Sequence, residues 1–173
     1  MILIISGTNR LNSNSLRLAK YYEKELRNAG QDCEILSLTE LPATVVTTDL
    51  YGKRSDEFAV LQEKVSSSQK YIFIAPEYNG SFPGVLKLFI DACTYPTTFA
   101  NKKVALVGIS AGRYGNIRGI DHLTGVCHYM KMHVLPIKIH IPSIQQEISL
   151  EGELLQASTQ KFIDEQIKEL IRY

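Results

Sequence analysis

The sequence has no tryptophan and only three cysteines in 173 residues, at Cys33, Cys93 and Cys127. The cysteines lie far apart and form no CxxC pair, so a disulfide framework and a zinc site are both poorly supported. Each cysteine falls in an apolar stretch. The sequence therefore predicts three reduced thiols buried in a core.

An excess of charge of one sign is also lacking, because 19 Lys and Arg residues balance 18 Asp and Glu residues to a net charge of +1. The basic residues are scattered, which argues against nucleic acid and against a membrane surface as partners. No apolar run approaches the ~20 residues of a transmembrane helix. Residues 1–7 lack the basic start and the apolar core of a signal peptide. We therefore expect a soluble, cytoplasmic protein.

Short apolar runs alternate with amphipathic stretches along the whole chain. This alternation is typical of βαβ units and a parallel sheet. The expected strands cover residues 2–6, 33–38, 71–75, 104–109 and 134–141. The expected helices cover about 15–29, 56–67, 84–94, 117–130 and 154–171. The stretch 41–55, with Pro42 and Gly52, is expected to be an irregular and mobile loop.

Five strands and five helices in this order predict an α/β protein, with a five-stranded parallel sheet in a three-layer α/β/α sandwich and one domain over residues 1–173. The strand order 2-1-3-4-5 is the common solution at this size. The last strand alternates polar and apolar residues and contains Pro136, so we place it at an edge. The helix at 84–94 is apolar almost all round, which favours a homodimer or homotetramer with a partner subunit on one face.

Helical spacing also predicts which side chains face inward, and it places Gly30 as a left-handed cap after the first helix. The expected inward residues are Leu18, Tyr22, Leu26 and Ala29; Phe58, Leu61 and Val65; Ile117, Ile120, Leu123, Cys127 and Met130; and Leu155, Phe162, Ile163, Ile167, Leu170 and Ile171.

In this topology the ligand crevice lies outside the carboxyl ends of strands 1 and 3. The first loop there joins a buried strand to a helix start, where backbone N–H groups and a partial positive charge favour a phosphate. It carries the donors Thr8, Arg10, Ser13, Asn14 and Ser15. Such donors suit a phosphate monoester, although Ser13 or Asn14 as a simple helix N-cap is the alternative. The loop has neither a Walker A nor a GxGxxG pattern.

The loop after the third strand contains Pro76, Pro83 and Gly80, which make it stiff and able to present backbone groups to a flat heterocycle. Tyr78 and Asn79 add a stacking ring and an amide. A turn that only ends the strand is the alternative. The glycine-rich loop 110–115 after the fourth strand is a weaker signal, and an ordinary turn remains open there.

Together these loops resemble the NADPH-dependent FMN reductase family, a flavodoxin-like group that includes azobenzene, quinone and chromate reductases. The first motif of that family fits Gly7, Thr8, Arg10, Ser13 and Ser15. Its second motif fits Pro76, Tyr78, Asn79, Ser81, Pro83, Leu86, Lys87 and Asp91. One departure is Leu88, where the family usually has asparagine, and this departure bears on the packing of that helix, a subunit contact included.

The resemblance implies a flavodoxin-like fold and a bound FMN. Its phosphate would contact Thr8, Arg10, Ser13, Asn14 and Ser15. Its ring would be lined, mostly by backbone groups, by Pro76, Glu77, Tyr78, Asn79 and Gly80, with Ser110, Gly112 and Arg113 beside it. The implied activity is ping-pong transfer of electrons from NADPH or NADH to a small-molecule acceptor such as a flavin, quinone, azo dye or metal oxyanion.

Two other functions stay open at this point, an electron-carrier flavodoxin and a flavin-free binding or regulatory module. A carrier usually has a strongly acidic surface, which this near-neutral chain lacks. No catalytic side chain and no metal are expected, because a flavin carries its own redox chemistry. The four histidines show no ligand spacing and are expected at the surface, and Lys87 and Asp91 are expected to form a helical ion pair.

Overall fold

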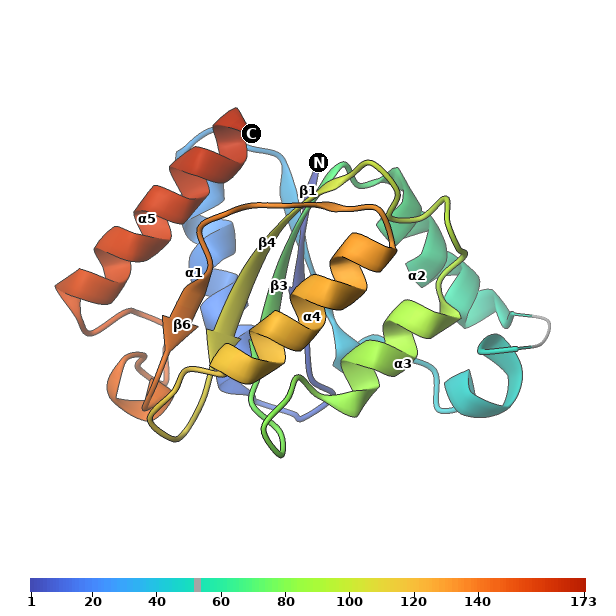
Figure 1. The fold of residues 1–173 in the computed structure, drawn as a ribbon, viewed down its shortest axis with the longest axis horizontal. Coiled ribbons are helices and arrows are strands. Elements are labelled where there is room, and N and C mark those ends of the chain that lie inside the picture. Colours follow the sequence, from blue (N-terminus) through green and yellow to red (C-terminus); the bar gives the residue numbers. More distant parts are fainter. Residues whose placement is uncertain (52–53) are drawn as a thin grey trace.

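The computed structural model describes residues 1–51 and 54–173 and has a parallel sheet at its centre (Figure 1). The central strands are β1 (Ile2–Ser6), β2 (Cys33–Ser37), β3 (Lys70–Pro76) and β4 (Lys103–Ile109). The order β2-β1-β3-β4-β5 confirms the predicted topology.

The prediction of one continuous fifth strand over 134–141 is wrong. It is two segments, β5 (His133–Val134) and β6 (Ile139–Ile141), which both pair with β4 and bring the sheet to six strands. Pro136 has no N–H to donate, so the ladder stops after Leu135 donates to the carbonyl of Val104. It resumes where Ile139 pairs with Val107.

In the described part of the chain, five helices flank the sheet, and three short helical turns lie between the strands and helices. They are α1 (Asn14–Asn28), α2 (Asp56–Ser67), α3 (Gly84–Ala92), α4 (Ile117–Tyr129), α5 (Ala157–Arg172), η1 (Leu38–Glu40), η2 (Val45–Asp49) and η3 (Ile144–Gln146). Leu3 and Ile5 pack with α2, α3 and α4, whereas Ile2 and Ile4 pack with α1 and α5. This alternation along β1 produces the three layers.

Four of the predicted inward residues are exposed instead. Ala29 follows the last residue of α1, and Leu155 precedes α5, which begins at Ala157. Ile117 is the first residue of α4 and Phe162 lies on the outer face of α5, where their exposed fractions are 47% and 57%. The remaining members of the helical stripes are buried or half-buried.

The end of one helix also differs from the sequence prediction, while the cap at Gly30 is confirmed by its φ of +72°. The helix expected at 84–94 ends at Ala92. Within the stretch 41–55, the turn η2 is helical rather than irregular. The expectation of mobility there includes Gly52, which lies outside the described residues.

The three cysteines are free and buried, as predicted. Burial raises the pKa of the Cys93 and Cys127 thiols to about 12 and raises that of Cys33 as well. Because the thiolate is the reactive form, these thiols are poor nucleophiles at neutral pH. Their buried side chains contribute to the packing of the core.

The predicted surface positions hold for His122, His128 and His133, whereas His140 is half-buried with Nδ1 3.3 Å from the carbonyl of Gly115. The predicted ion pair between Lys87 and Asp91 is present at 2.7 Å.

Among the described residues, no helix combines the length and the apolar character needed to cross a membrane.

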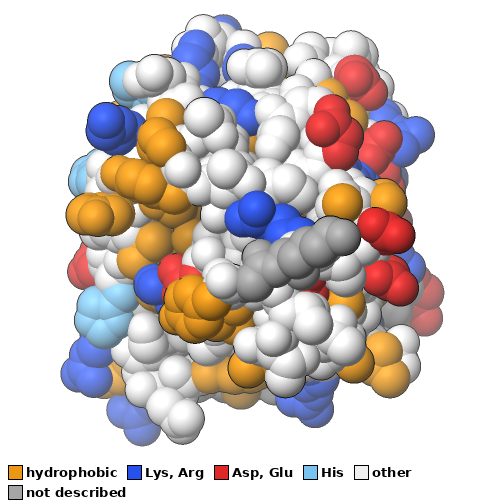
Figure 2. All heavy atoms as spheres, turned by 90° about the vertical axis from the view of Figure 1, so that its right-hand side faces the viewer, with side chains coloured by type: hydrophobic (Ala, Val, Ile, Leu, Met, Phe, Trp, Pro, Cys, Tyr) orange, Lys and Arg blue, Asp and Glu red, His pale blue; other side chains and the backbone are white. Residues whose placement is uncertain are grey.

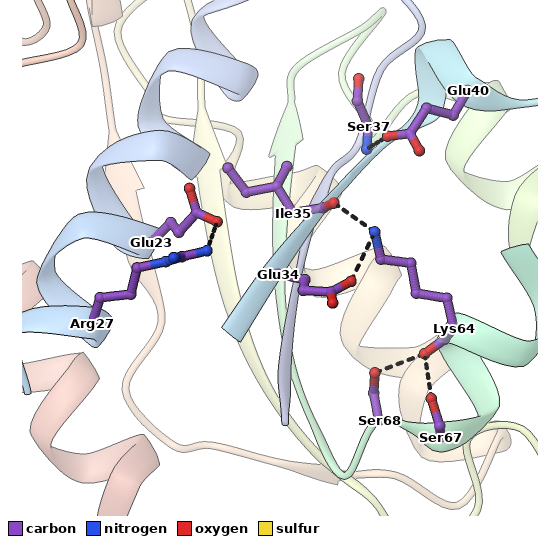
Figure 3. Close-up of polar contacts among 9 residues, drawn as sticks. All are labelled: Glu23, Arg27, Glu34, Ile35, Ser37, Glu40, Lys64, Ser67 and Ser68. Carbon is purple, nitrogen blue, oxygen red and sulfur yellow. Dashed lines mark hydrogen bonds and ion pairs between the residues drawn. The ribbon is translucent and has the colours of Figure 1, made fainter. Parts of the chain in front are cut away.

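Strand β2 at one edge of the sheet is tied to α2 by Lys64 (Figure 3). The Lys64 ammonium donates to the carbonyl of Ile35 at 3.1 Å and forms an ion pair with the Glu34 carboxylate, also at 3.1 Å. Where β2 ends, the N–H of Ser37 donates to Glu40 at 2.8 Å and closes a capping box. The Lys64 contacts fix the edge strand to the helix that covers it, and the capping box fixes the turn that follows the strand.

Candidate functional site

A cavity of about 480 Å³ opens at the carboxyl edge of the sheet, and a second hollow of about 580 Å³ adjoins it. The loops after β1, β3 and β4 line them, so the topology brings the three predicted loops together. The cavity is lined by Thr8, Arg10, Ser13, Asn14, Ser15, Pro76, Glu77, Tyr78 and Ser110. The adjoining hollow is lined by Glu77, Asn79, Gly80, Ser110, Gly112 and Arg113.

The start of α1 provides the donors at one end of the cavity. Ser13 is the N-cap, and its hydroxyl oxygen accepts from the N–H of Leu16 at 3.2 Å while its own proton stays available. Ser15 is 1% exposed, and its hydroxyl has no hydrogen-bond partner among the described residues. The first turn of α1 contains no acidic residue. This donor set at a helix N-terminus fits a phosphate ester.

Two arginines line this end of the cavity in different ways. Arg10 is exposed, whereas Arg17 is half-buried. The Arg17 guanidinium donates to the side-chain oxygen of Asn14 at 2.6 Å. Sequence reasoning missed Arg17 because it treated this segment as the interior of a helix. Its spacing of three from Asn14 was the available signal, because residues three apart share a helix face.

The loop after β3 ends in a tight hairpin turn at Asn79 and Gly80, whose φ angles are +52° and +75°. The N–H of Tyr78 donates to Ser81 at 2.9 Å and the N–H of Ser81 donates back at 3.1 Å. The N–H of Glu77 donates to Ile109 at 2.8 Å. Of the N–H groups in 77–80, those of Asn79 and Gly80 alone have no acceptor within the described part of the chain.

One hydrogen bond joins the loop after β1 to the loop after β3. The Thr8 side-chain oxygen lies 2.9 Å from the Tyr78 hydroxyl, and it also accepts from the N–H of Arg10 at 3.3 Å. The two walls of the cavity are thereby held at a fixed separation. Tyr78 is 40% exposed, so its ring also forms part of the rim.

The loop after β4 is shaped from within by Ser110. Its hydroxyl donates to the carbonyl of Gly112 and accepts from the N–H of Gly115, both at 2.9 Å. Asn116, which sequence reasoning missed, has a φ of +60° and donates from its side chain to the carbonyl of Ala75 at 2.9 Å. Arg113 is exposed. This wall is rigid at its base and open at its tip.

A fourth segment also reaches the cavity, and no sequence pattern predicted it. Ile144 and Gln145 of η3 line the side next to Ser110, and the N–H of Ile144 donates to the carbonyl of Ser110 at 2.9 Å. The cavity is thus closed by chain that follows β6. Its overall form, a polar end at α1 and a flat opening between two stiff loops, suits a phosphorylated planar ligand.

Residues 1–146 match the sequence profile of the NADPH-dependent FMN reductase family. The chain belongs to this family. It is an oxidoreductase of the FMN- and NAD(P)H-dependent kind. The match covers β1 to η3 and includes every segment that lines the cavity.

Individual relatives agree with this family membership. The chain is 29% identical over 168 residues to an NAD(P)H-dependent FMN reductase of Pseudomonas aeruginosa, covering 91% of this chain and 90% of that one. It is 31% identical over 114 residues to an FMN-dependent NADPH-azoreductase of Staphylococcus aureus, covering 64% and 60% of the two chains. A 2-hydroxy-1,4-benzoquinone reductase of a Burkholderia species is 27% identical over 106 residues, covering 59% and 58%.

Among solved structures, the flavoenzyme NAD(P)H:(acceptor) oxidoreductase FerB of Paracoccus denitrificans superposes with a TM-score of 0.83 at 21% identity, covering 99% of this chain and 95% of that one. A flavodoxin of Megasphaera elsdenii superposes with a TM-score of 0.60 at 17% identity, covering 96% and 98%. At these identities the likeness is one of fold, and it confirms the flavodoxin-like architecture expected of an FMN reductase family member.

Proposed function

We propose that residues 1–173 act as one FMN-binding domain that reduces a small acceptor with NADPH or NADH. The observation that carries this proposal is the buried Ser15 hydroxyl without a partner, at the start of α1 in the cavity that all three predicted loops line. A buried polar group without a partner destabilises the protein unless a ligand supplies one.

In this proposal the FMN phosphate is bound by the donors at the start of α1, and the ring lies along the loops after β3 and β4. The phosphate ligands are Thr8, Arg10, Ser13, Asn14 and Ser15. The ring is lined by Pro76, Glu77, Tyr78, Asn79 and Gly80, and by Ser110, Gly112 and Arg113. When bound, FMN supplies the hydride and electron chemistry. The chain's own residues hold and orient it, and the N–H groups of Asn79 and Gly80 are placed to stabilise negative charge at the ring.

The acceptor and the nicotinamide are proposed to use the same open side of the site in turn, which is ping-pong behaviour. Acceptors of the flavin, quinone or azo class suit this arrangement, as the names of the relatives indicate. Anaerobic titration of the FMN-loaded protein with NADPH or NADH should bleach its visible absorbance, and adding a benzoquinone should restore it. An electron-carrier flavodoxin would not be bleached by either nicotinamide, and a flavin-free module would bind no FMN.

Arg10→Ala is expected to weaken FMN binding by about 10- to 100-fold, because charge-assisted hydrogen bonds contribute about 1.5–3 kcal/mol. Fluorescence titration of the cofactor-free protein with FMN measures the change. Lys20→Ala is a matched control, since Lys20 is an exposed cation of α1 that does not line the cavity. Equal FMN affinity in the Arg10 variant and the control would refute the phosphate assignment.

A separate hollow of about 650 Å³ lies between α3 and α4, and the residues that line it include Ile90, Tyr95 and Tyr129. We propose that a second copy of the chain covers it, in a homodimer or homotetramer. Figure 2 shows hydrophobic side chains gathered over these helices, toward the left of that face. Tyr95 and Tyr129 stack there with ring centroids 6.0 Å apart, although they are 57% and 76% exposed. Sedimentation of the protein and of Tyr129→Glu should show an oligomer that the substitution dissociates.

Reduced buried thiols support a cytoplasmic location.

A further inference from the structure

We infer that Arg17 is a second phosphate-binding cation, positioned by Asn14, which makes the site selective for the phosphorylated flavin over riboflavin. This inference rests on the proposed function, because it assigns a specificity role within the proposed FMN site. The two residues lie three apart on the first turn of α1, so their side chains share a face of the helix.

The Arg17 side chain is positioned by a hydrogen bond. Its guanidinium donates to the Asn14 side-chain oxygen at 2.6 Å. One contact to Asn14 leaves other N–H groups of the planar guanidinium available to a ligand. An arginine held in this way loses less conformational entropy on binding than a free one.

The charge of Arg17 is not neutralised by a neighbouring acid. No carboxylate among the described residues lies within ion-pair distance of it, although Glu77 lines the same cavity. The first turn of α1 has no acidic residue. Arg17 and the positive end of the helix therefore act on the same ligand charge.

A second observation points independently to an anion at this position. The Ser15 hydroxyl, two residues before Arg17, is 1% exposed, lines the cavity and has no partner among the described residues. A phosphate oxygen satisfies this hydroxyl and the guanidinium together. Riboflavin lacks that group, so it leaves the Ser15 hydroxyl without a partner and the Arg17 charge without an anion.

The two arginines therefore have different roles. Arg10 is exposed, and it binds the phosphate through a side chain that no hydrogen bond among the described residues holds in advance. Arg17 is half-buried and preorganised, and it contributes the discrimination between a phosphate and a hydroxyl.

The test compares the affinity of the cofactor-free protein for FMN and for riboflavin by fluorescence titration. Arg17→Ala is expected to weaken FMN binding by about 10-fold or more and to change riboflavin binding by less than about 3-fold. Arg17→Gln keeps an amide donor for Asn14 without the charge, and it should show the same loss of preference if the first variant folds poorly. Lys20→Ala is the control for removing a cation from α1, and circular dichroism checks the fold of each protein.

An unchanged ratio of FMN to riboflavin affinity in both Arg17 variants would overturn the inference while leaving the proposed function intact. A wild-type protein that binds riboflavin as tightly as FMN would overturn both, because no phosphate would then be recognised. A weaker dependence of FMN affinity on salt in Arg17→Ala than in wild type is also expected, since one cation fewer faces the ligand.

Discussion

Gly108→Ala is expected to destabilise the protein by about 3 kcal/mol and to displace one wall of the proposed flavin site. Gly108 lies in β4, and a Cβ there would be 2.3 Å from the carbonyl oxygen of Gly115 and 2.7 Å from the Ile120 side chain. The first of these is backbone, so the clash cannot be relieved by rotating a side chain. The loop leading into α4 has to move, and the contact from Asn116 to the end of β3 moves with it.

Urea unfolding measures the first effect and FMN titration the second. Gly112→Ala is the matched control for stability, because nothing lies within 4 Å of a Cβ at Gly112. That control should stay within about 0.5 kcal/mol of wild type. If Gly108→Ala and the control have the same free energy of unfolding, then the close approach of β4 to the loop does not constrain the fold.

The largest effect away from the site is expected for Gln166→Leu, which should lower the free energy of unfolding by about 3–5 kcal/mol. Gln166 is fully buried in α5. It accepts from the Tyr22 hydroxyl at 2.8 Å and donates to the carbonyls of Leu106 and Ile137 at 3.1 and 3.0 Å. Leucine satisfies none of these, and each buried polar group left without a partner costs about 1–3 kcal/mol.

A double-mutant cycle separates the hydrogen-bond network from simple packing. Tyr22→Phe removes the hydroxyl that Gln166→Leu leaves without a partner, so the two substitutions together should cost less than the sum of their separate costs. Strictly additive costs in urea unfolding would mean that the Tyr22–Gln166 contact contributes nothing to stability.

The topology and the site loops were predictable because they depend on local patterns and on general rules for parallel sheets. Apolar runs placed β1, β3 and β4, and the strand order then put the loops at Thr8, Tyr78 and Ser110 at one edge. All thirteen predicted site residues line the cavity or the adjoining hollow. Whether they bind FMN is a separate question, which the titrations address.

The remaining features depend on contacts between distant parts of the chain. Periodicity favoured Phe162 as a core residue of α5, but Phe162 is exposed and the polar Gln166 is buried. The burial of Gln166 depends on its hydrogen bond with Tyr22, which lies on the distant helix α1. The wall at Ile144 follows from the return of the chain after β6, which no local pattern specifies. The proline at position 136 could be read from the sequence as an interruption of the strand. That β5 and β6 on either side of it both pair with β4 depends on how the chain packs.

The two edges of the sheet also bear on how copies of the protein can associate. At β2, Lys64 occupies the carbonyl of Ile35 that would otherwise face an added strand. At the opposite edge, the interruption at Pro136 leaves two short segments and no continuous row of backbone groups. Extension of the sheet from one molecule into another, the common route to aggregation, is disfavoured at both ends. Any contact between copies of the chain is therefore directed to the helical surfaces rather than to the sheet edges.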